Sequence, residues 1–542
     1  MLVAVVPGDG GSGVLAPLDD GGRPSAPASA VTDLAAAVAA HPAARFVWAS
    51  TAAVYPALLR AGVRVERCHD VELTEALLLG SAGRWGEPRA VAAAWARLTG
   101  APVPADPPPV AAAPPGHGQD ALFDTPTARP AIGLDELVRV YADQLARVAA
   151  TPHPARFRLL VAAESAGALI AAEINEVGLP WRADVHDEML RDLLGPPSPV
   201  GPPRRLVELA AAVSGAFGVR QLRVDSPGEV LRAFSRAGIE LPNTRSWVLQ
   251  TVDHPAVPLL REYKELYRVW TAHGWAWRDA WVAGGRFRPE FVPGGVVSGR
   301  WATRGGGALQ IPKVVRRAVV ADPGWTFVVA DAGQLEPRVL AAMSGDSRLA
   351  AAARAGDLYA ALAADAFEGD RAKAKVALLG AMYGQTGGAA IPALAVLRRH
   401  YPTAFDYVEA AARTGEAGGL VRSWLGRTCP PSSVVTRLDD EPSPSSARAR
   451  GRFTRNFVVQ ATAAEWALAL LATLRAALAG GPAELVFFQH DEVMVHCPAA
   501  VAPEVAAAVQ GAAVRAGQAL FGDTEVRFPL DVSVVDCYAD AA

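Results

Sequence analysis

Residues 325–344 read WTFVVADAGQLEPRVLAAMS, and their pattern indicates the class of fold. An apolar run leads to Asp331, and a helical pattern with Pro337 near its start follows. This order predicts a strand, a turn and a helix, in which Pro337 is tolerated because the first helical turn needs no backbone donor there. A carboxylate at the end of such a strand projects into a crevice rather than into the core. The stretch predicts an α/β protein with Asp331 in a candidate site.

A second segment, ELVFFQHDEVMVHCP at 484–498, is predicted to be a β-hairpin. Its polar tip is Gln489-His490-Asp491, and Glu492 follows. Carboxylates on adjacent strand ends can bind two hard divalent cations about 3.5–4 Å apart, which suits phosphoryl transfer. Taken alone, each of these carboxylates could be an ordinary turn residue at a strand end.

A third segment, RAKAKVALLGAMYG at 371–384, is a predicted helix. One face carries four residues spaced by four positions: Arg371, Lys375, Leu379 and Tyr383. Two cations one turn apart suit a triphosphate better than a core. The chain has only four lysines among its 52 basic residues, and two of them lie in this segment, which points to a need for an ammonium group. The alternative is an ordinary solvated basic face.

The composition sets broad limits. The 542 residues are 51% hydrophobic and 20% charged, and 52 Lys+Arg against 55 Asp+Glu give a net charge of −3. This excludes a mainly disordered chain and predicts several domains, while the charge gives no support for a nucleic-acid partner unless arginines form a local stripe. Four scattered cysteines predict neither a zinc site nor a disulfide framework. Without a signal-peptide pattern or a long uninterrupted apolar stretch, a soluble intracellular protein with no membrane partner is expected.

Proline-rich stretches divide the chain. Residues 102–115 are expected to be a linker, and residues 195–203 a break in the chain. Residues 430–446 are expected to be an exposed loop. Residues 1–100 are predicted to be a small α/β unit that contains the strands MLVAVV and ARFVWAS. Residues 132–195 and 225–284 are predicted to be mostly helical, and one long helix is expected over 453–481.

The three segments resemble, in order, the motifs of the family A DNA polymerases (the DNA polymerase I type). VVADAGQLEPRVLAAMSGD resembles motif A, RAKAKVALLGAMYGQ resembles motif B, and QHDEVMV resembles motif C. SGR at 298–300, LQIP at 309–312 and RFTRNFVVQATAAEWA at 452–467 support this resemblance, which covers residues 155–542. It implies a multidomain α+β right hand: a degenerate, faintly similar exonuclease-like domain (1–130), thumb (131–290), palm (291–345 and 456–542) and fingers (346–455).

The resemblance also implies roles by position. It makes Asp331 and Asp491 the metal-binding carboxylates, with Glu492 beside them, and Lys375 the group that neutralises or protonates the leaving pyrophosphate. The implied nucleotide-binding residues are Arg371, Lys375, Leu379, Tyr383, Glu336 and Gln334. Among these, Glu336 is the expected steric gate against a 2′-hydroxyl, hydrogen-bonded to Tyr383. The implied DNA contacts are Arg300, Gln310, Arg452, Asn456, Gln460 and His490.

The nucleotide pocket departs from the family pattern. Ala332-Gly333 stand where the family has Tyr-Ser, Leu379 replaces the aromatic residue of motif B, and Asp357-Leu358-Tyr359 replaces Asp-Ile-His. These changes leave the metal carboxylates in place but remove contacts to the nucleotide. Weaker or less selective nucleotide binding is therefore expected.

The N-terminal region departs further. A proofreading exonuclease needs a D-x-E on its first strand, and VAVVPGDGGSG has none. Its second motif would place an acid after Tyr55, where Pro56 stands, and only Asp135 or Glu136 could supply the last acid. No 5′-nuclease domain is expected before it. A two-metal nuclease cannot work without its ligands, so no proofreading is expected.

The resemblance implies a DNA-templated DNA polymerase of replication or repair. It would use two Mg²⁺ ions, with Mn²⁺ possible, and bind primer–template DNA and deoxynucleoside triphosphates. A monomer in the cytoplasm, at the nucleoid, is expected. The alternative is a catalytically weak polymerase-like scaffold that binds DNA in repair, which the altered sugar pocket would favour.

Overall fold

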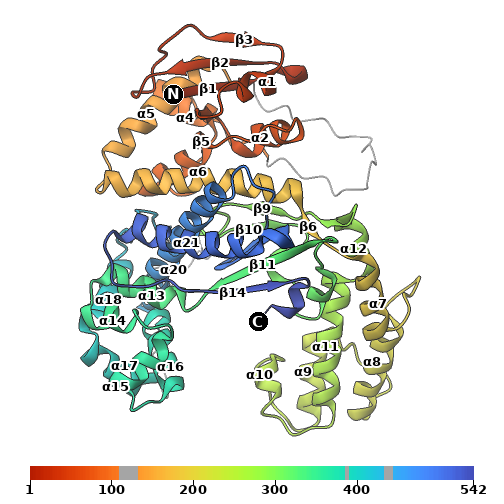
Figure 1. Ribbon diagram of the computed structural model, residues 1–542. Helices are drawn as coiled ribbons and strands as arrows, with labels where there is room; N and C mark the ends of the chain where they lie inside the picture. Colours follow the sequence, from red (N-terminus) through yellow and green to blue (C-terminus); the bar gives the residue numbers. More distant parts are fainter. Residues whose placement is uncertain (109–131, 385–389, 432–443, 542) are drawn as a thin grey trace.

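A four-stranded antiparallel sheet in the order β12-β13-β11-β14 lies at the middle of the computed structural model (Figure 1). The structure describes residues 1–108, 132–384, 390–431 and 444–541. The strands are β11 (Trp325–Ala332), β12 (Glu484–Gln489), β13 (Glu492–Pro498) and β14 (Leu530–Val535). Helix α21 (Ala502–Phe521) packs against β11, β13 and β14, and α20 (Pro444–Ala477) packs against α21. The apolar run before Asp331 is thus buried.

The two segments that supply carboxylates fold as predicted. Helix α13 (Leu335–Ser344) follows β11 with Pro337 in its first turn, and β12 and β13 form the hairpin. The strand–turn–helix and the mixed α/β class are therefore confirmed.

Two helical arms extend from the sheet, one from each end, towards the same side of the molecule (Figure 1). One arm consists of α7 (Ala183–Leu194), α8 (Arg204–Ala216), α9 (Pro227–Arg236), α10 (Ser246–Leu249), α11 (Ala256–His273) and α12 (Trp275–Trp281). The other consists of α14 (Ser347–Ala352), α15 (Leu358–Ala366), α16 (Arg371–Tyr383), α17 (Ala390–His400) and α18 (Pro402–Glu416). The break predicted at 195–203 falls between α7 and α8. Residues 225–284, predicted to be mostly helical, contain four helices. The first interruption is at 237–245, where Gly238 adopts a φ of 79° and Pro242 cannot continue a helix, and the second is at 250–255.

The N-terminal unit contains a five-stranded sheet in the order β3-β2-β1-β4-β5. Its strands are β1 (Leu2–Pro7), β2 (Gly13–Leu18), β3 (Ser29–Val31), β4 (Arg45–Trp48) and β5 (Arg67–Asp70). Its helices are α1 (Leu34–Ala39), α2 (Thr51–Arg60), α3 (Val71–Ser81), α4 (Val91–Thr99) and α5 (Leu134–Ala149). The small α/β unit predicted at the start of the chain is confirmed. Its core extends past residue 130, the expected boundary, because Leu137 and Tyr141 of α5 pack with Ala4 and Val47 of the sheet.

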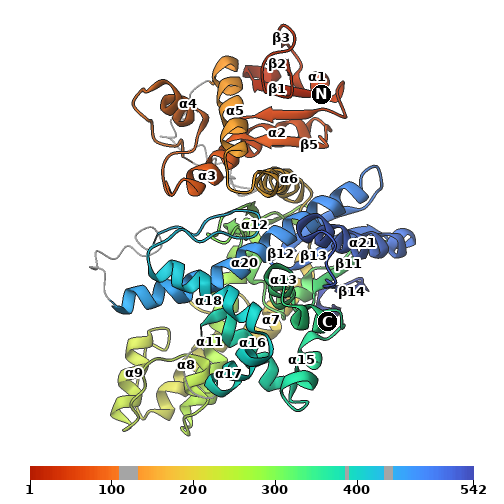
Figure 2. The same cartoon turned by 90° about the vertical axis from the view of Figure 1, so that its left-hand side faces the viewer.

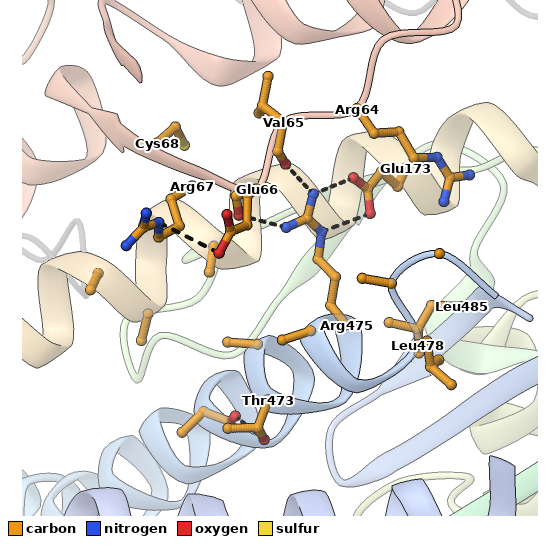
Figure 3. Close-up of a pocket in the computed structure, with 18 of the residues that line it drawn as sticks. Arg64, Val65, Glu66, Arg67, Cys68, Glu173, Thr473, Arg475, Leu478 and Leu485 are labelled. Carbon is orange, nitrogen blue, oxygen red and sulfur yellow. Dashed lines mark hydrogen bonds and ion pairs between the residues drawn. The ribbon is translucent and has the colours of Figure 1, made fainter. Parts of the chain in front are cut away.

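Helix α6 (Pro154–Val177) lies between the N-terminal unit and the rest of the molecule in both views (Figures 1 and 2). Its Glu173 accepts a hydrogen bond from the Tyr55 hydroxyl of α2 at 2.6 Å and pairs with Arg475 of α20 at 2.7 Å. Arg475 also donates to the backbone carbonyls of Val65 and Glu66 (Figure 3). One guanidinium therefore joins α20, α6 and the loop before β5, beside a cavity of about 530 Å³.

Helix α20 begins earlier than predicted. The expected loop 430–446 was wrong at its end, because residues 444–446 are the first turn of α20, and Pro444 is tolerated there. Residues 432–443 of that loop, and 109–115 of the predicted linker, lie outside the described residues. Within α20 the stretch Ser445–Ala477 is long and apolar enough to cross a membrane, but 83% of its most apolar window is buried inside the protein. Its hydrophobicity therefore serves the core.

The remaining elements are short. The strands are β6 (Leu179–Pro180), β7 (Val282–Ala283), β8 (Arg286–Phe287), β9 (Glu290–Val292) and β10 (Ala302–Arg304). The single-turn 3₁₀ helices are η1 (Asp9–Gly11), η2 (Ala308–Gln310), η3 (Val315–Ala318), η4 (Ala499–Val501) and η5 (Tyr538–Asp540).

Candidate active site

A row of polar residues crosses one end of the central sheet. Asp331 of β11 is paired with Glu492 of β13 on one side and with Asp531 of β14 on the other, and Glu492 is paired with Gln489. Directly paired residues on antiparallel strands have Cβ atoms about 4.5–5.5 Å apart on the same face. Three carboxylates are thus adjacent, of which sequence analysis identified two.

Asp491 reaches the same place from the tip of the hairpin. His490 adopts a φ of 58°, which turns the chain sharply between β12 and β13. The Ala332 amide donates to the Asp491 carbonyl at 3.1 Å and so holds the tip against the end of β11. Asp331 and Asp491 consequently line one cavity of about 300 Å³, as does His490.

The carboxylates are electrostatically unfavourable to one another. Burial, and then the negative charge of Asp331, raise the pKa of Asp491 to about 6. Burial and the charge of Asp531 raise the pKa of Asp331. Burial also raises the pKa of Glu492, although the hydrogen bond from the Tyr538 hydroxyl opposes this. Oxygen ligands that repel one another fit a hard divalent cation, whose charge would offset the repulsion.

The site is open rather than a closed metal cage. Within the described ranges, no group of three or more His, Cys, Asp or Glu side chains is arranged to hold a metal ion. Asp331 and Asp491 could therefore supply only part of a coordination sphere. Mg²⁺ commonly has one or two protein carboxylates and completes its shell with water and substrate phosphates.

Glu336 joins three elements at the wall of the cavity. Its side chain, on the first turn of α13, accepts a hydrogen bond from the Tyr383 hydroxyl at the end of α16. Its other oxygen accepts from the Arg300 guanidinium at 2.6 Å. Burial and Glu336 together raise the pKa of Tyr383, so its hydroxyl remains a donor. The predicted Glu336–Tyr383 hydrogen bond is present, and Arg300 is ion-paired within the cavity.

Only part of the predicted face of α16 lines the cavity. Leu379 and Tyr383 line it, whereas Arg371 and Lys375 lie nearer the start of the helix and are exposed. The Arg371 Nε donates to Asp357 at 2.7 Å. Of these four residues, the apolar and the aromatic member therefore line the cavity, and the two cations lie outside its lining on the exposed part of the helix.

The predicted DNA contacts on α20 occur at every fourth position. Arg452 is exposed and packs against the end of α16 at Gly384, while Asn456 and Gln460 are half-buried. The buried Asn456 Oδ1 has no hydrogen-bond partner among the described residues. None of the three lines the cavity, and the side chain of Gln310 lies outside the described part of the chain.

Sequence analysis missed several residues that support the site. Arg338 is fully buried and donates to five backbone carbonyls around the start of α13. Tyr538 supports Glu492, and the Arg316 guanidinium lies 4.2 Å from the centre of its ring. Asp531 could have been noticed as an acid within the alternating strand LDVSVV. Arg338 lies within the motif A segment, whereas nothing local marks Tyr538 or Arg316.

The candidate nuclease acids of the N-terminal unit have other roles. Asp135 pairs with Arg139 on the surface of α5. Glu136 accepts a hydrogen bond from the Gly133 amide at 3.0 Å and so caps the same helix. Tyr55 is fully buried and bound to Glu173. These contacts stabilise helices and the contact between units.

Residues 231–538 match the family described as DNA polymerase family A. The chain is similar to DNA polymerase I of Chloroflexus aurantiacus, with 30% identity over 40% of this chain and 25% of that one. It is also similar to the thermostable DNA polymerase I of Thermus thermophilus, with 28% identity over 52% of this chain and 36% of that one. The chain thus matches about a quarter to a third of the length of these relatives.

Among solved structures, the fold is similar to that of the POL domain of Pol1 from M. smegmatis, determined in complex with DNA primer-template and dNTP. The TM-score is 0.71 at 18% sequence identity, and the match covers 99% of this chain and 95% of the other. The shared fold includes the N-terminal unit as well as the central sheet and both arms. Because the family match covers more than half of the chain and includes all three motif segments, the chain belongs to DNA polymerase family A.

Proposed function

We propose that this protein is a DNA-templated DNA polymerase that extends a primer 3′-hydroxyl with deoxynucleoside triphosphates. The observation that carries the proposal is the meeting of Asp331 and Asp491 in one cavity whose wall is formed by Glu336 and Tyr383. Family membership supports the same activity. The proposed partners are primer–template DNA and deoxynucleotides, and the proposed place of action is the bacterial cytoplasm, at the nucleoid.

Each residue has a proposed task in this reaction. Asp331 and Asp491 would hold divalent cations, two Mg²⁺ or Mn²⁺, with Glu492 beside them. Such cations would supply alignment of the attacking and leaving oxygens and neutralisation of their charge. Arg371 and Lys375 bind the phosphates, and Lys375 can give a proton to the leaving pyrophosphate. Glu336 occupies the space of a ribose 2′-hydroxyl and is held there by Tyr383 and Arg300.

The arms and the sheet have corresponding proposed tasks. The arm α7–α12 is the thumb, the sheet with α13, α20 and α21 is the palm, and the arm α14–α18 is the fingers. The proposed contacts to the DNA duplex are Arg452, Asn456 and Gln460 on α20, together with Gln310 of η2. His490 is proposed to lie by the primer terminus. The N-terminal unit is proposed to be a degenerate exonuclease-like domain without proofreading, since Asp135 and Glu136 are engaged in helix contacts.

A DNA-binding scaffold with little catalysis is the less favoured function. The altered sugar pocket, with Leu379 in place of an aromatic ring, would suit it. A scaffold has no need of repelling carboxylates, however, and near neutral pH a bound cation would offset the cost that the raised pKa of Asp491 reflects.

Primer extension with Mg²⁺ and with Mn²⁺ tests the proposal. Asp331→Ala or Asp491→Ala should abolish extension, whereas DNA binding should persist because it depends on arginine–phosphate contacts. Asp536→Ala is the matched control, since Asp536 is an exposed acid just beyond β14. Extension by both active-site variants within about tenfold of the wild type would reject the metal-ligand assignment.

A further inference from the structure

The carboxylate of Asp357 lies between the turn after Asp331 and the first residue of α16. Its Oδ1 accepts hydrogen bonds from the Gln334 side-chain amide at 2.8 Å and from the Ala360 amide at 3.1 Å. Its Oδ2 accepts from the Arg371 Nε at 2.7 Å. The Gln334 side chain closes the arrangement by accepting from the Leu358 amide at 2.8 Å.

Helix α16 is thereby attached at both of its ends to the start of α13. At its start, Arg371 is bound to Asp357, and Asp357 to Gln334. At its end, Tyr383 is bound to Glu336, which lies in the first turn of α13, two residues after Gln334. Gln334 itself has a φ of 59°, a left-handed conformation that glutamine adopts at a cost. The cost is understandable if the side chain has to reach Asp357.

The ion pair uses only one edge of the guanidinium. Arginine has five N–H donors, and the Nε–H is the one given to Asp357, so the terminal nitrogens can still bind an anion. Burial alone would raise the pKa of Asp357, but the hydrogen bonds from Arg371 and Gln334 outweigh it and hold the pKa at about 2. The pair is therefore charged at any working pH. The side chains of Arg371 and Asp357 are 53% and 40% exposed, so the pair adds little stability, and its effect is to fix a direction.

We propose that Asp357 is a positioning residue for the incoming nucleotide: it holds Arg371 with the free edge of its guanidinium towards the triphosphate. Through Gln334 it also ties that guanidinium to the turn that carries Asp331. The inference rests on the proposed polymerase function. The alternative role predicts the opposite effect on nucleotide binding, because an acid that does not position Arg371 would only repel the triphosphate.

The sign of one substitution separates these two roles. Asp357→Asn keeps the oxygen that receives the Gln334 and Ala360 hydrogen bonds, and asparagine is as good a helix N-cap as aspartate. It replaces the oxygen that faces Arg371 with a donor. If Asp357 positions Arg371, the KM for deoxynucleotides rises about two- to tenfold, because Arg371 must now be ordered by the substrate itself, while kcat changes less. If Asp357 only repels, KM falls.

Asp370→Asn is the matched control. Asp370 precedes Arg371, caps α16 through the Lys373 amide at 3.0 Å, and carries the same charge next to Arg371 in the chain. Its neutralisation should leave KM unchanged or lower it. A rise in KM for Asp370→Asn equal to that for Asp357→Asn would overturn the inference, since loss of charge alone would then explain both.

A double-mutant cycle tests whether Asp357 acts through Arg371. In an Arg371→Ala background, Asp357→Asn should have no further effect on KM. The same four proteins should be titrated calorimetrically with inorganic tripolyphosphate and Mg²⁺, where Asp357→Asn alone should weaken binding about two- to tenfold. This readout needs no turnover, so a wild type that binds tripolyphosphate but cannot extend primers would reject the proposed function only. An unchanged or tighter affinity for Asp357→Asn, or an equal loss in the Arg371→Ala background, would overturn the positioning role.

Discussion

The negative charge of Asp491 destabilises the folded protein when no cation is bound beside it. The pKa of this carboxyl is raised to about 6 from 3.8, so the folded state holds the charged form less well than the unfolded chain does. The resulting cost is fully present above about pH 6 and disappears as the pH falls through that value towards 4. Two pKa units correspond to about 3 kcal/mol, and partial solvent access reduces this to about 1–3 kcal/mol.

Asp491→Asn should therefore stabilise the metal-free protein while it abolishes extension. With EDTA near neutral pH, the variant should have a Tm about 1–3 °C above that of the wild type, and the difference should shrink at about pH 4. Mg²⁺ should raise the Tm of the wild type more than that of the variant. A metal-free Tm at or below that of the wild type would show that the carboxylates do not repel one another.

Arg338 fixes the position of α13 relative to the neighbouring elements. Its guanidinium is 0% exposed and donates to the carbonyls of Gly333, Ala353, Ala355, Gly356 and Arg527. The turn after β11, the end of α14 and the chain entering β14 thus share one donor group. Burial lowers its pKa, but these acceptors offset the cost of the buried charge.

Arg338→Met should keep the length of the side chain and leave five carbonyls without this donor. We expect a loss of about 3–5 kcal/mol in the free energy of unfolding, measured by urea denaturation. Arg354→Met is the control, because Arg354 is 56% exposed and lies 3.7 Å from Glu525, and such a pair contributes at most about 1 kcal/mol. Equal losses in the two variants would contradict the role given to Arg338.

Local patterns in the sequence predicted the elements that carry the site, but not the contacts between distant residues. The β11–turn–α13 segment and the hairpin were predictable because an apolar run that stops at an acid, or at a polar tip, is a local pattern. The adjacency of Asp331 and Asp491 followed from the motifs. The Asp357–Arg371 pair joins residues 14 positions apart, and the Arg475–Glu173 pair joins residues 302 apart. Such contacts depend on how elements pack, which no periodicity in the sequence records.

Arg475 connects the N-terminal unit to the part of the molecule that carries the site, through hydrogen bonds and an ion pair. It lies on α20, makes two hydrogen bonds to Glu173 of α6, at 2.9 and 2.7 Å, and donates to the carbonyls of Val65 and Glu66 (Figure 3). Glu173 in turn receives the Tyr55 hydroxyl. The side chains of Arg475 and Glu173 are only 16% and 9% exposed, so removing one partner leaves a buried charge unpaired.

Arg475→Met should therefore loosen the N-terminal unit before the rest of the protein. In calorimetry we expect an additional transition at lower temperature, and in hydrogen exchange we expect faster exchange over residues 65–70, with a loss of about 3–5 kcal/mol in local stability. Arg67→Met is the control at the neighbouring start of β5, because its 3.7 Å pair with Glu66 is 50% and 60% exposed. Primer extension well below the first transition should persist in both variants, since neither residue lines the site. A single unshifted transition for Arg475→Met would mean that apolar packing of α6 alone holds the two parts together, and that the guanidinium at their junction is dispensable.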